Sequence, residues 1–385
     1  MTRTWDRDTP SSASGLSAIT PIVYPTTSPT TPSATPATIS TTATHRFIRP
    51  PRPSSRARAL DPDHLDVRVW QTSRTSSPAS VSGLAARVGE DGPVPQITVE
   101  NVTGPVAHHG EGPVWSPSWG GLRWLDMLAG DLLTLRADGA VDRLHVGDHA
   151  AVVRPRTGGG FVVGLARGLV VADSDDSPVR PLPALFDDPT VRLNEGAAGP
   201  DGAFYAGGMA DGARPGASAL FRVEADGTSR VVVEDVTCAN GLAFSPDGSR
   251  AYWTDSLTHR VDVLDVVPAE EDPRGLVRRR PFVTVDPSDG LPDGIAVDAE
   301  GGVWVALWGG AAVRRYSPDG TLDAVVPLPV SQVSACAFGG DGLDELYVTT
   351  SRQGFGTPDP DEAASGSLYV ARPGVRGLPT LPFSG

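Results

Sequence analysis

A short sequence pattern recurs six times between residues 95 and 385, at intervals of roughly 40 to 55 residues. Most units open with a polar or small residue, then a small one and a short apolar segment. A tight turn and a strand rich in aromatic and β-branched residues follow. This period is typical of the four-stranded blades of a β-propeller, so the sequence predicts an all-β fold, a six-bladed β-propeller. The unit starts are Glu111-Gly112, Val152-Val153, Glu195-Gly196, Asn240-Gly241, Asp293-Gly294 and Cys336-Ala337.

The turn inside the units has a physical basis. The fourth unit contains Ser245-Pro246-Asp247-Gly248, followed by a strand-like segment at 251–254. Proline presets φ at the second position of a turn, and glycine accepts the positive φ needed near its end. Segments 199–205 and 298–305 repeat the pattern, the latter with Ala-Glu-Gly in place of Pro-Asp-Gly. We therefore expect two consecutive strands joined by a hairpin in these units.

The ends of the repeat region predict how the ring closes. One strand is expected at 96–102, before the first unit, and another at 367–371, near the C-terminus. Pairing these two strands in one blade would close the ring and remove its sheet edges. The fourth unit is the longest, and we expect its insert at 268–280 to lie in a loop at the outer strand. The second unit is the least regular.

Residues 1–93 differ in composition from the rest of the chain. They are rich in Ser, Thr, Pro and Arg, most clearly at 26–44 and 49–58, and show no sustained apolar period. Such a segment cannot bury enough apolar surface to offset its ordering entropy. We expect a disordered extension over 1–93, either a basic interaction arm or a dispensable segment, followed by the propeller domain over 94–385.

Charge and residue usage exclude several classes of function. The net charge is −14, and all 32 basic residues are arginine. An acidic chain binds nucleic acid poorly, and without lysine neither a Schiff base nor a P-loop can form. Because no apolar run approaches the ~18 residues of a membrane helix and the N-terminus lacks a secretory signal, we expect a cytoplasmic protein without a membrane partner. Cys238 and Cys336 belong to no CxxC pair and are expected to be buried thiols.

Polar side chains stand at corresponding positions of four units. In a propeller the innermost strand of each blade lines the central channel, so equivalent positions converge on one mouth. Crowded carboxylates raise one another's pKa unless a cation compensates them, and carboxylate and amide oxygens suit hard divalent ions. One divalent metal ion is therefore expected, Ca²⁺, Mg²⁺ or Mn²⁺, with Zn²⁺ as a further candidate. The residues at these positions are Glu111, Asn194, Glu195, Asn240 and Asp293.

Each of these dipeptides also has an ordinary structural explanation. Asp-Gly, Asn-Gly and Glu-Gly are common in turns, and a single one indicates nothing beyond a turn. Asp138, Asp247 and Asp319 lie in the expected distal turns and are interpreted as turn formers. The recurrence at matched positions in four units favours a functional cluster.

Five short sequence motifs occur in a specific order and spacing between Gly110 and Tyr369. They are Gly110-Glu111-Gly112-Pro113-Val114-Trp115, Arg192-Leu193-Asn194-Glu195-Gly196, Asn240-Gly241-Leu242-Ala243-Phe244-Ser245-Pro246-Asp247-Gly248, Pro292-Asp293-Gly294-Ile295-Ala296-Val297-Asp298 and Ala337-Phe338-Gly339-Gly340. Together they resemble the SMP-30, gluconolactonase and luciferin-regenerating enzyme family. The resemblance implies a six-bladed propeller with one divalent ion held by Glu111, Asn240 and Asp293, and substrate contacts from Arg192 and Asn194. An acidic residue that family members use further along has no clear equivalent in 211–218.

The cluster and the resemblance predict a metal-dependent lactonase acting on a sugar-derived lactone. The ion would polarise the lactone carbonyl, and Asp293, the predicted catalytic residue, would take a proton from the attacking water. The absence of a G-x-S-x-G motif argues against a serine esterase. Two alternatives stay open: a metal-dependent hydrolase of another ester or a phosphotriester, and a non-catalytic propeller that serves as a scaffold or regulates cations. We expect a small-molecule lactone as partner, and a monomer or a weak homo-oligomer.

Histidines and one tryptophan are further candidates for the wall of the funnel. His108 and His109 lie beside Glu111 and could contact the substrate, although solvent-facing loop positions are the default expectation. Trp308, followed by two glycines, could wall the pocket or belong to a blade core. Three other histidines are expected to be structural or exposed, namely His145, His149 and His259.

Overall fold

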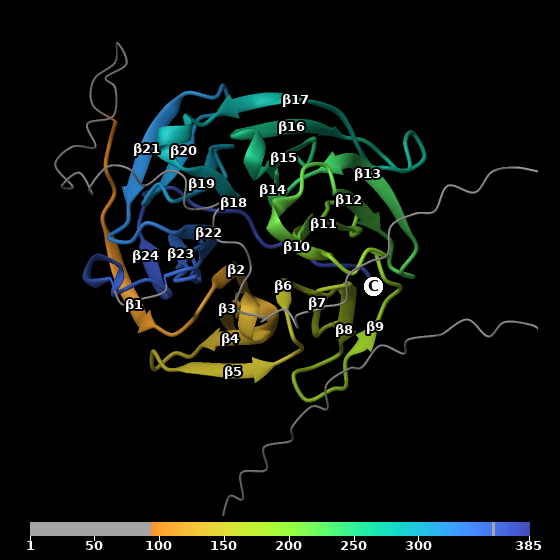
Figure 1. Ribbon diagram of the computed structural model, residues 1–385, viewed down its shortest axis with the longest axis horizontal. Coiled ribbons are helices and arrows are strands. Elements are labelled where there is room, and N and C mark those ends of the chain that lie inside the picture. Colours follow the sequence, from red (N-terminus) through yellow and green to blue (C-terminus); the bar gives the residue numbers. More distant parts are fainter. Residues whose placement is uncertain (1–93, 356–358) are drawn as a thin grey trace, which may run out of the picture.

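The computed structural model describes residues 94–355 and 359–385, and this part of the chain forms six four-stranded antiparallel sheets. The sheets stand as blades around a central axis (Figure 1). The all-β, six-bladed propeller predicted from the repeats is therefore confirmed. The predicted extension over 1–93 lies outside the described residues.

Strands of the first three blades pair in sequence order from the axis outward. Blade 1 contains β2 (Gly110–Ser116), β3 (Gly121–Asp126), β4 (Asp131–Leu135) and β5 (Val141–His145). Blade 2 contains β6 (Ala150–Pro155), β7 (Phe161–Leu165), β8 (Gly168–Ala172) and β9 (Arg180–Pro181). Blade 3 contains β10 (Val191–Ala198), β11 (Phe204–Ala210), β12 (Ser218–Val223) and β13 (Ser229–Val236).

The last three blades follow the same order, and the sixth closes the ring. Blade 4 contains β14 (Ala239–Phe244), β15 (Arg250–Asp255), β16 (Arg260–Val266) and β17 (Leu276–Thr284). Blade 5 contains β18 (Leu291–Val297), β19 (Val303–Trp308), β20 (Ala312–Tyr316) and β21 (Leu322–Pro327). Blade 6 joins β22 (Val333–Gly339), β23 (Glu345–Thr350) and β24 (Ser367–Ala371) to β1 (Val99–Pro105), so both ends of the domain share one sheet, as predicted.

Short 3-10 helices make up the helical structure of the described residues. Most follow directly on the first or second strand of a blade and continue the chain around a turn. They are η2 (Pro117–Trp119), η3 (Met127–Ala129), η4 (Asp211–Ala213), η5 (Ser256–Thr258), η6 (Pro287–Asp289) and η7 (Pro360–Glu362). No helix among the described residues is long and apolar enough to cross a membrane.

Every inner strand carries a β-bulge. The pairing register with the second strand shifts directly after Glu111, Ala150, Leu193, Asn240, Pro292 and Val333. A bulge bends the strand and re-aims the side chains beside it. The bulges also correct the alignment of the units, because the predicted unit starts at Val152, Glu195 and Cys336 lie downstream of the bulges in their strands. A repeat period carries no signal for a single extra residue in one strand.

Two glycines allow neighbouring inner strands to approach each other closely. A Cβ atom on Gly241 of β14 would lie 2.5 Å from the Ile295 nitrogen and 2.6 Å from the Asp293 carbonyl oxygen of β18. A Cβ atom on Gly294 would lie 2.4 Å from the Cβ atom of Ala335 in β22. No side chain fits at such distances, so glycine at these positions sets how near the axis the strands can meet.

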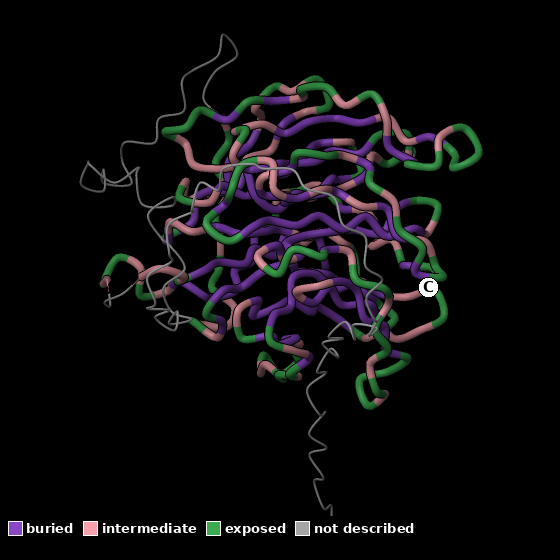
Figure 2. Tube along the Cα trace, turned by 45° about the vertical axis from the view of Figure 1, so that its right-hand side comes forward, coloured by how far each residue is buried: buried purple, intermediate pink, exposed green. Residues whose placement is uncertain are grey.

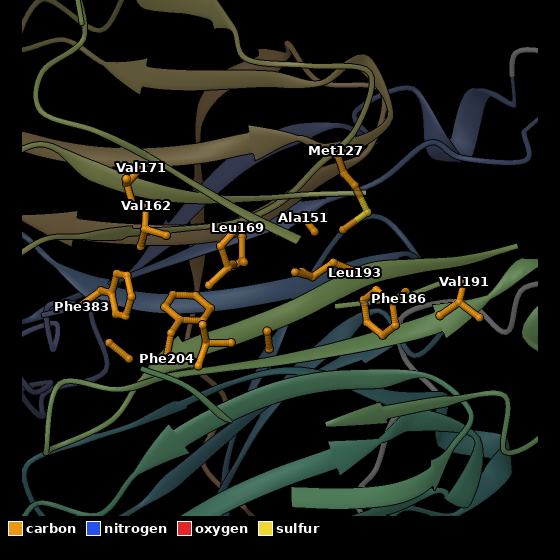
Figure 3. Close-up of a cluster of buried hydrophobic side chains, with 14 of the residues drawn as sticks. Met127, Ala151, Val162, Leu169, Val171, Phe186, Val191, Leu193, Phe204 and Phe383 are labelled. Carbon is orange, nitrogen blue, oxygen red and sulfur yellow. The ribbon is translucent and has the colours of Figure 1, made fainter. Parts of the chain in front are cut away.

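The hydrophobic core lies between neighbouring blades. Trp124, Trp253 and Trp304, each in the second strand of its blade, are at most 1% exposed. Figure 3 shows the cluster between blades 2 and 3, in which Phe204 of β11 packs against Phe383 from the C-terminal segment. In Figure 2 the strands of the interior are buried and the exposed residues gather in the turns. Burial of these apolar side chains supplies the main driving force for stacking the blades.

The C-terminal segment 372–385, called the tail below, crosses the channel at the ends of the inner strands. Its backbone and the Thr380 hydroxyl form hydrogen bonds to five blades, at the last residues of inner strands or in the turns that follow them. Its phenylalanine, Phe383, is fully buried. The bonds join Gly377 N to Leu343 O, Ala299 N to Arg376 O, Thr380 Oγ1 to Trp115 O, Phe383 N to Pro155 O and Ser384 N to Gly202 O. The tail therefore fastens the ring on this side.

Some predicted boundaries differ from the structure. The strand expected at 96–102 is β1, which begins at Val99 and extends to Pro105, while Gln96 forms only an isolated bridge to Val325. The insert of the fourth unit is a turn over 268–275, but its remainder belongs to the outer strand β17. The irregular second unit corresponds to blade 2, whose outer strand β9 has only 2 residues.

Candidate active site

Three predicted metal ligands from blades 1, 4 and 5 meet near the axis. Glu111, Asn240 and Asp293 lie beside the bulges of β2, β14 and β18, and all three are buried. The negative charge of Glu111 raises the pKa of Asp293, after the larger effect of burial. Asn240 reaches the strand of Asp293 through Ser256, whose hydroxyl accepts from Asn240 Nδ2 at 2.7 Å and donates to the Pro292 carbonyl at 2.7 Å. The bulged inner strands therefore place these side chains in one small region.

Arg192 and Asn194 of β10 join this cluster through hydrogen bonds. Arg192 Nη1 donates to Asn194 Oδ1 at 2.6 Å, and Asn194 Nδ2 donates to Asn240 Oδ1 at 2.8 Å. Because Asn240 Nδ2 donates to Ser256 on its other side, the orientation of the Asn240 amide is fixed. Its oxygen accepts one hydrogen bond and keeps a second lone pair. The two predicted substrate-binding residues thus lie against the predicted ligand set.

Burial makes the carboxylate pair electrostatically unfavourable. Removal from water raises the pKa of Asp293 well above its usual value, and the negative charges of Glu111 and Glu195 raise it further. The pKa of Glu111 is raised by the same causes, burial first and then Glu195, against a hydrogen bond from the Gly112 N–H. Two such carboxylates need either a proton or a nearby cation.

The donor set fits a hard divalent cation. Asp293 Oδ1 is buried and has no hydrogen-bond partner, which is unusual for a carboxylate oxygen in a protein interior. Two carboxylates and an amide oxygen are the ligand types preferred by Ca²⁺, Mg²⁺ and Mn²⁺. Within 94–355 and 359–385 there is no group of three or more His, Cys, Asp or Glu side chains that could hold a metal ion. A site here therefore depends on Asn240 as the third ligand.

Glu195, grouped with the cluster by its sequence position, faces another part of the channel. Its Oε1 atom lies 3.7 Å from Arg154 Nη2 and accepts a hydrogen bond from the Gly196 N–H at 2.7 Å. Both side chains line a cavity of about 470 Å³, and tail residues 378–381 line it as well. Glu195 is paired with an arginine in this cavity, and it acts on Glu111 and Asp293 through its charge.

Arg192 is half-buried among sulfur-containing and acidic side chains. Its Nη2 atom lies 3.1 Å from the Met209 sulfur, and burial lowers its pKa. The negative charges of Asp211 and Glu111 oppose this shift. Asp211 stands at the start of η4, directly after β11, in the segment where the sequence offered no clear acidic residue. The structure thus places one carboxylate of that segment within electrostatic reach of Arg192.

Two histidines line the same region, and for His109 this is contrary to the default expectation of a solvent-facing loop position. His109 is buried, its Nε2 lies 3.8 Å from Glu111 Oε1, and burial, followed by the charge of Arg192, lowers its pKa to about 3. Its ring meets Trp308 edge-on, with centroids 5.5 Å apart, so Trp308 belongs to the wall of this region. His149 is also buried, with Nε2 3.1 Å from the Leu193 carbonyl and 3.4 Å from Arg192 Nη1.

The other histidines are away from the cluster. His108 is exposed, and its backbone N–H donates to Asp126. His145 pairs with Asp131, and His259 ends η5 in the left-handed conformation. These positions agree with the expected structural or exposed roles.

A comparison with protein families decides the relationship. Residues 109–352 match the SMP-30/Gluconolactonase/LRE-like region, and this segment contains the three predicted ligands, Arg192, Asn194 and both buried histidines. The chain belongs to this family. The resemblance noted from the sequence motifs is therefore confirmed.

Relatives of this SMP-30/gluconolactonase family member include proteins named as lactonases. It is 34% identical over 287 residues to the L-arabinolactonase of Azospirillum brasilense, covering 72% of this chain and 92% of the relative. It is 35% identical over 282 residues to the 6-deoxy-6-sulfogluconolactonase of Pseudomonas putida, covering 72% and 95%. A solved structure of regucalcin from Agrobacterium tumefaciens, described as a calcium-binding protein, superposes with a TM-score of 0.68 at 26% identity, covering 76% of this chain and 99% of that one.

Sequence reasoning missed several residues of this family member's site. Ser256, which connects Asn240 with the strand of Asp293, belongs to no motif that bears chemistry. The sequence nevertheless contains a motif that marks this region: Trp-x-Asp occurs at the end of β3 and again at the end of β15, directly before η3 and η5. The carboxylates of Asp126 and Asp255 each accept hydrogen bonds from two consecutive backbone N–H groups, at 108–109 and at 237–238. These hydrogen bonds fix the backbone just before β2 and β14, and thereby help to position Glu111 and Asn240.

Proposed function

We propose that the protein is a metal-dependent lactonase that hydrolyses a sugar-derived lactone. The observation that carries the proposal is the pair of buried, mutually repelling carboxylates, Glu111 and Asp293, held beside Asn240 with one Asp293 oxygen left without a partner. Relatives named L-arabinolactonase and 6-deoxy-6-sulfogluconolactonase support a lactone as the substrate class. The partner would then be a small molecule.

Glu111, Asn240 and Asp293 would hold the cation, with Ca²⁺, Zn²⁺, Mn²⁺ and Mg²⁺ as the candidates. The bound ion would supply Lewis-acid polarisation of a carbonyl group and would neutralise the carboxylate pair. The all-oxygen donor set favours Ca²⁺, Mg²⁺ and Mn²⁺ over Zn²⁺, and the likeness to a regucalcin described as calcium-binding favours calcium among these three.

Asp293 would serve as the general base. It takes a proton from a water molecule as the water oxygen forms a bond to the lactone carbonyl carbon. The ring C–O bond then breaks, and the leaving oxygen receives the proton back, so that one lactone and one water yield one hydroxy acid. Arg192 and Asn194, joined by the 2.6 Å hydrogen bond, would bind substrate oxygens and fix the lactone against the cation site.

The test measures acid release from a panel of sugar lactones. Purified protein is treated with a chelator and then assayed in a pH-stat with Ca²⁺, Zn²⁺, Mn²⁺ or Mg²⁺ added back. The proposal predicts turnover that requires one of the metals. Phosphotriester and simple ester substrates are included, and preferential turnover of these would contradict the lactone assignment. Cation binding without turnover of any lactone would show a binding protein instead of a hydrolase.

A pair of Asp to Asn substitutions in blade 5 tests the role of the base. Asp293→Asn should lower kcat by at least about 100-fold, the usual contribution of a general base, while the far-UV circular dichroism stays unchanged. The matched control is Asp319→Asn, since Asp319 caps an exposed distal turn of the same blade through Ser317 and Thr321. Full turnover in Asp293→Asn would refute the assigned role.

A further inference from the structure

His109 joins three blades at the site. It lies directly before β2 of blade 1 and forms an isolated antiparallel bridge to Ser351 at the end of β23 in blade 6. Its ring packs edge-on against Trp308 of blade 5, at an interplanar angle of 73°. The residue is 6% exposed. A ring held from three sides in this way has one orientation available.

Hydrogen bonds determine which ring nitrogen faces which partner. The Gln353 N–H donates to Ser351 Oγ at 3.0 Å, so this oxygen already acts as an acceptor. Ser351 Oγ lies 2.7 Å from His109 Nδ1, and in the described part of the chain this nitrogen is the acceptor within reach of the Ser351 hydroxyl hydrogen, so we assign Nδ1 as the acceptor. With Nδ1 as the acceptor, the ring hydrogen resides on Nε2.

The Nε2–H group faces the carboxylate of Glu111. Nε2 lies 3.8 Å from Glu111 Oε1, while Oε2 of the same carboxylate accepts a hydrogen bond from the Gly112 N–H at 3.2 Å. The first separation exceeds a hydrogen bond, so its effect is an electrostatic attraction that favours one rotation of the carboxylate. Both oxygens of Glu111 are thereby oriented from opposite sides.

We propose that His109 is a positioning residue that holds the Glu111 carboxylate in the orientation needed to bind the cation. This inference rests on the proposed function, since it assumes that Glu111 is a ligand. Groups that orient a ligating carboxylate without touching the metal raise metal affinity, and their loss typically costs about 10- to 100-fold. Ser351 acts one step further out, because it fixes the ring of His109.

The experiment is a calorimetric titration of the full chain, freed of metal by a chelator, with Ca²⁺ and with Mn²⁺. His109→Phe keeps an aromatic ring against Trp308 but removes the N–H, and its Kd should rise about 10- to 100-fold. His109→Gln can place an amide N–H where Nε2 stood, so it should recover a large part of the affinity. The matched control is His108→Phe, the exposed neighbour, which should leave Kd within twofold of the wild type.

A double-mutant cycle separates positioning from mere packing. Ser351→Ala should weaken cation binding by releasing the histidine ring, and it should add little once His109 has already been replaced by Phe. Fully additive losses from the two substitutions would contradict the proposed chain from Ser351 through His109 to Glu111. Ser351→Ala and His109→Gln also keep the test available if His109→Phe does not fold.

The outcomes distinguish this inference from the proposed function. If the wild-type protein binds neither cation, and also binds neither Zn²⁺ nor Mg²⁺ in parallel titrations, the metal-dependent function is overturned. If the wild type binds and His109→Phe, His109→Gln and Ser351→Ala all bind within twofold of it, the cation site stands and the positioning role of His109 is wrong.

Discussion

The tail offers a direct test of how the ring is held together, through the substitution Phe383→Ala. The Phe383 ring is 0% exposed and meets the Phe204 ring edge-on, with centroids 5.8 Å apart. Its backbone N–H donates to the Pro155 carbonyl at 2.9 Å, and its carbonyl accepts from the Thr157 N–H at 2.9 Å. Alanine can keep both backbone bonds, so the substitution removes only the side chain from the core between blades 2 and 3.

The expected loss follows from this complete burial. Truncation of a fully buried phenylalanine costs about 3–5 kcal/mol, the sum of the lost transfer free energy and the cavity left behind. For a domain somewhat larger than 250 residues, 1 kcal/mol corresponds to about 2 °C in Tm, so the melting temperature should fall by about 6–10 °C. Urea unfolding followed by tryptophan fluorescence gives the free energy, and differential scanning calorimetry gives the Tm.

The control is Ser384→Ala, at the exposed neighbouring position. Ser384 contributes its backbone N–H to the Gly202 carbonyl, and alanine retains this bond. Its free energy of unfolding should therefore stay within about 0.5 kcal/mol of the wild type. If Phe383→Ala lowered the free energy of unfolding by less than 1 kcal/mol, the reasoning would be refuted, because the Phe383 side chain would then contribute little to the core.

Two further predictions address the axis and the thiols. Gly241→Ala should lower the free energy of unfolding by about 1–3 kcal/mol in urea titrations, because the added Cβ would lie 2.6 Å from the Asp293 carbonyl oxygen. The same displacement of β18 should weaken cation binding. A variant as stable as the wild type would show that β14 and β18 are farther apart. Cys238 and Cys336 should resist a disulfide reagent at pH 8 in the native protein and react fully in guanidinium chloride. Burial raises the pKa of Cys336 to about 12 and that of Cys238 as well, so native thiolate is scarce at this pH, and rapid native reaction of either thiol would contradict their burial.

Blade number and ring closure could be predicted because they depend on local signals that repeat. Pro246 and Gly248 mark one turn by their backbone preferences alone, and similar signals recur in other units. Residues 367–371 form the strand expected near the C-terminus, and they pair with β1 in the blade that contains β22. The gathering of Glu111, Asn240 and Asp293 follows from the same regularity, since equivalent positions of a ring converge on its axis.

What the sequence could not reveal depends on contacts between blades and on single-residue irregularities. The bulge in each inner strand shifts the register by one residue that the repeat does not encode, so the predicted starts of the second, third and sixth units lie downstream of it. His109 gains its importance from Ser351, 242 residues away in the chain. The tail has no periodic pattern, because its partners are backbone groups of other blades. Its role becomes visible only when the five blades it touches are in place.

The most direct test of the central claim is an anomalous diffraction map from crystals of the protein soaked in Mn²⁺. The account predicts one strong peak near the axis, coordinated by oxygens of Glu111, Asn240 and Asp293 from blades 1, 4 and 5. A fully soaked crystal without a peak there, or with its strongest peak ligated by other residues such as Glu195, would contradict the account.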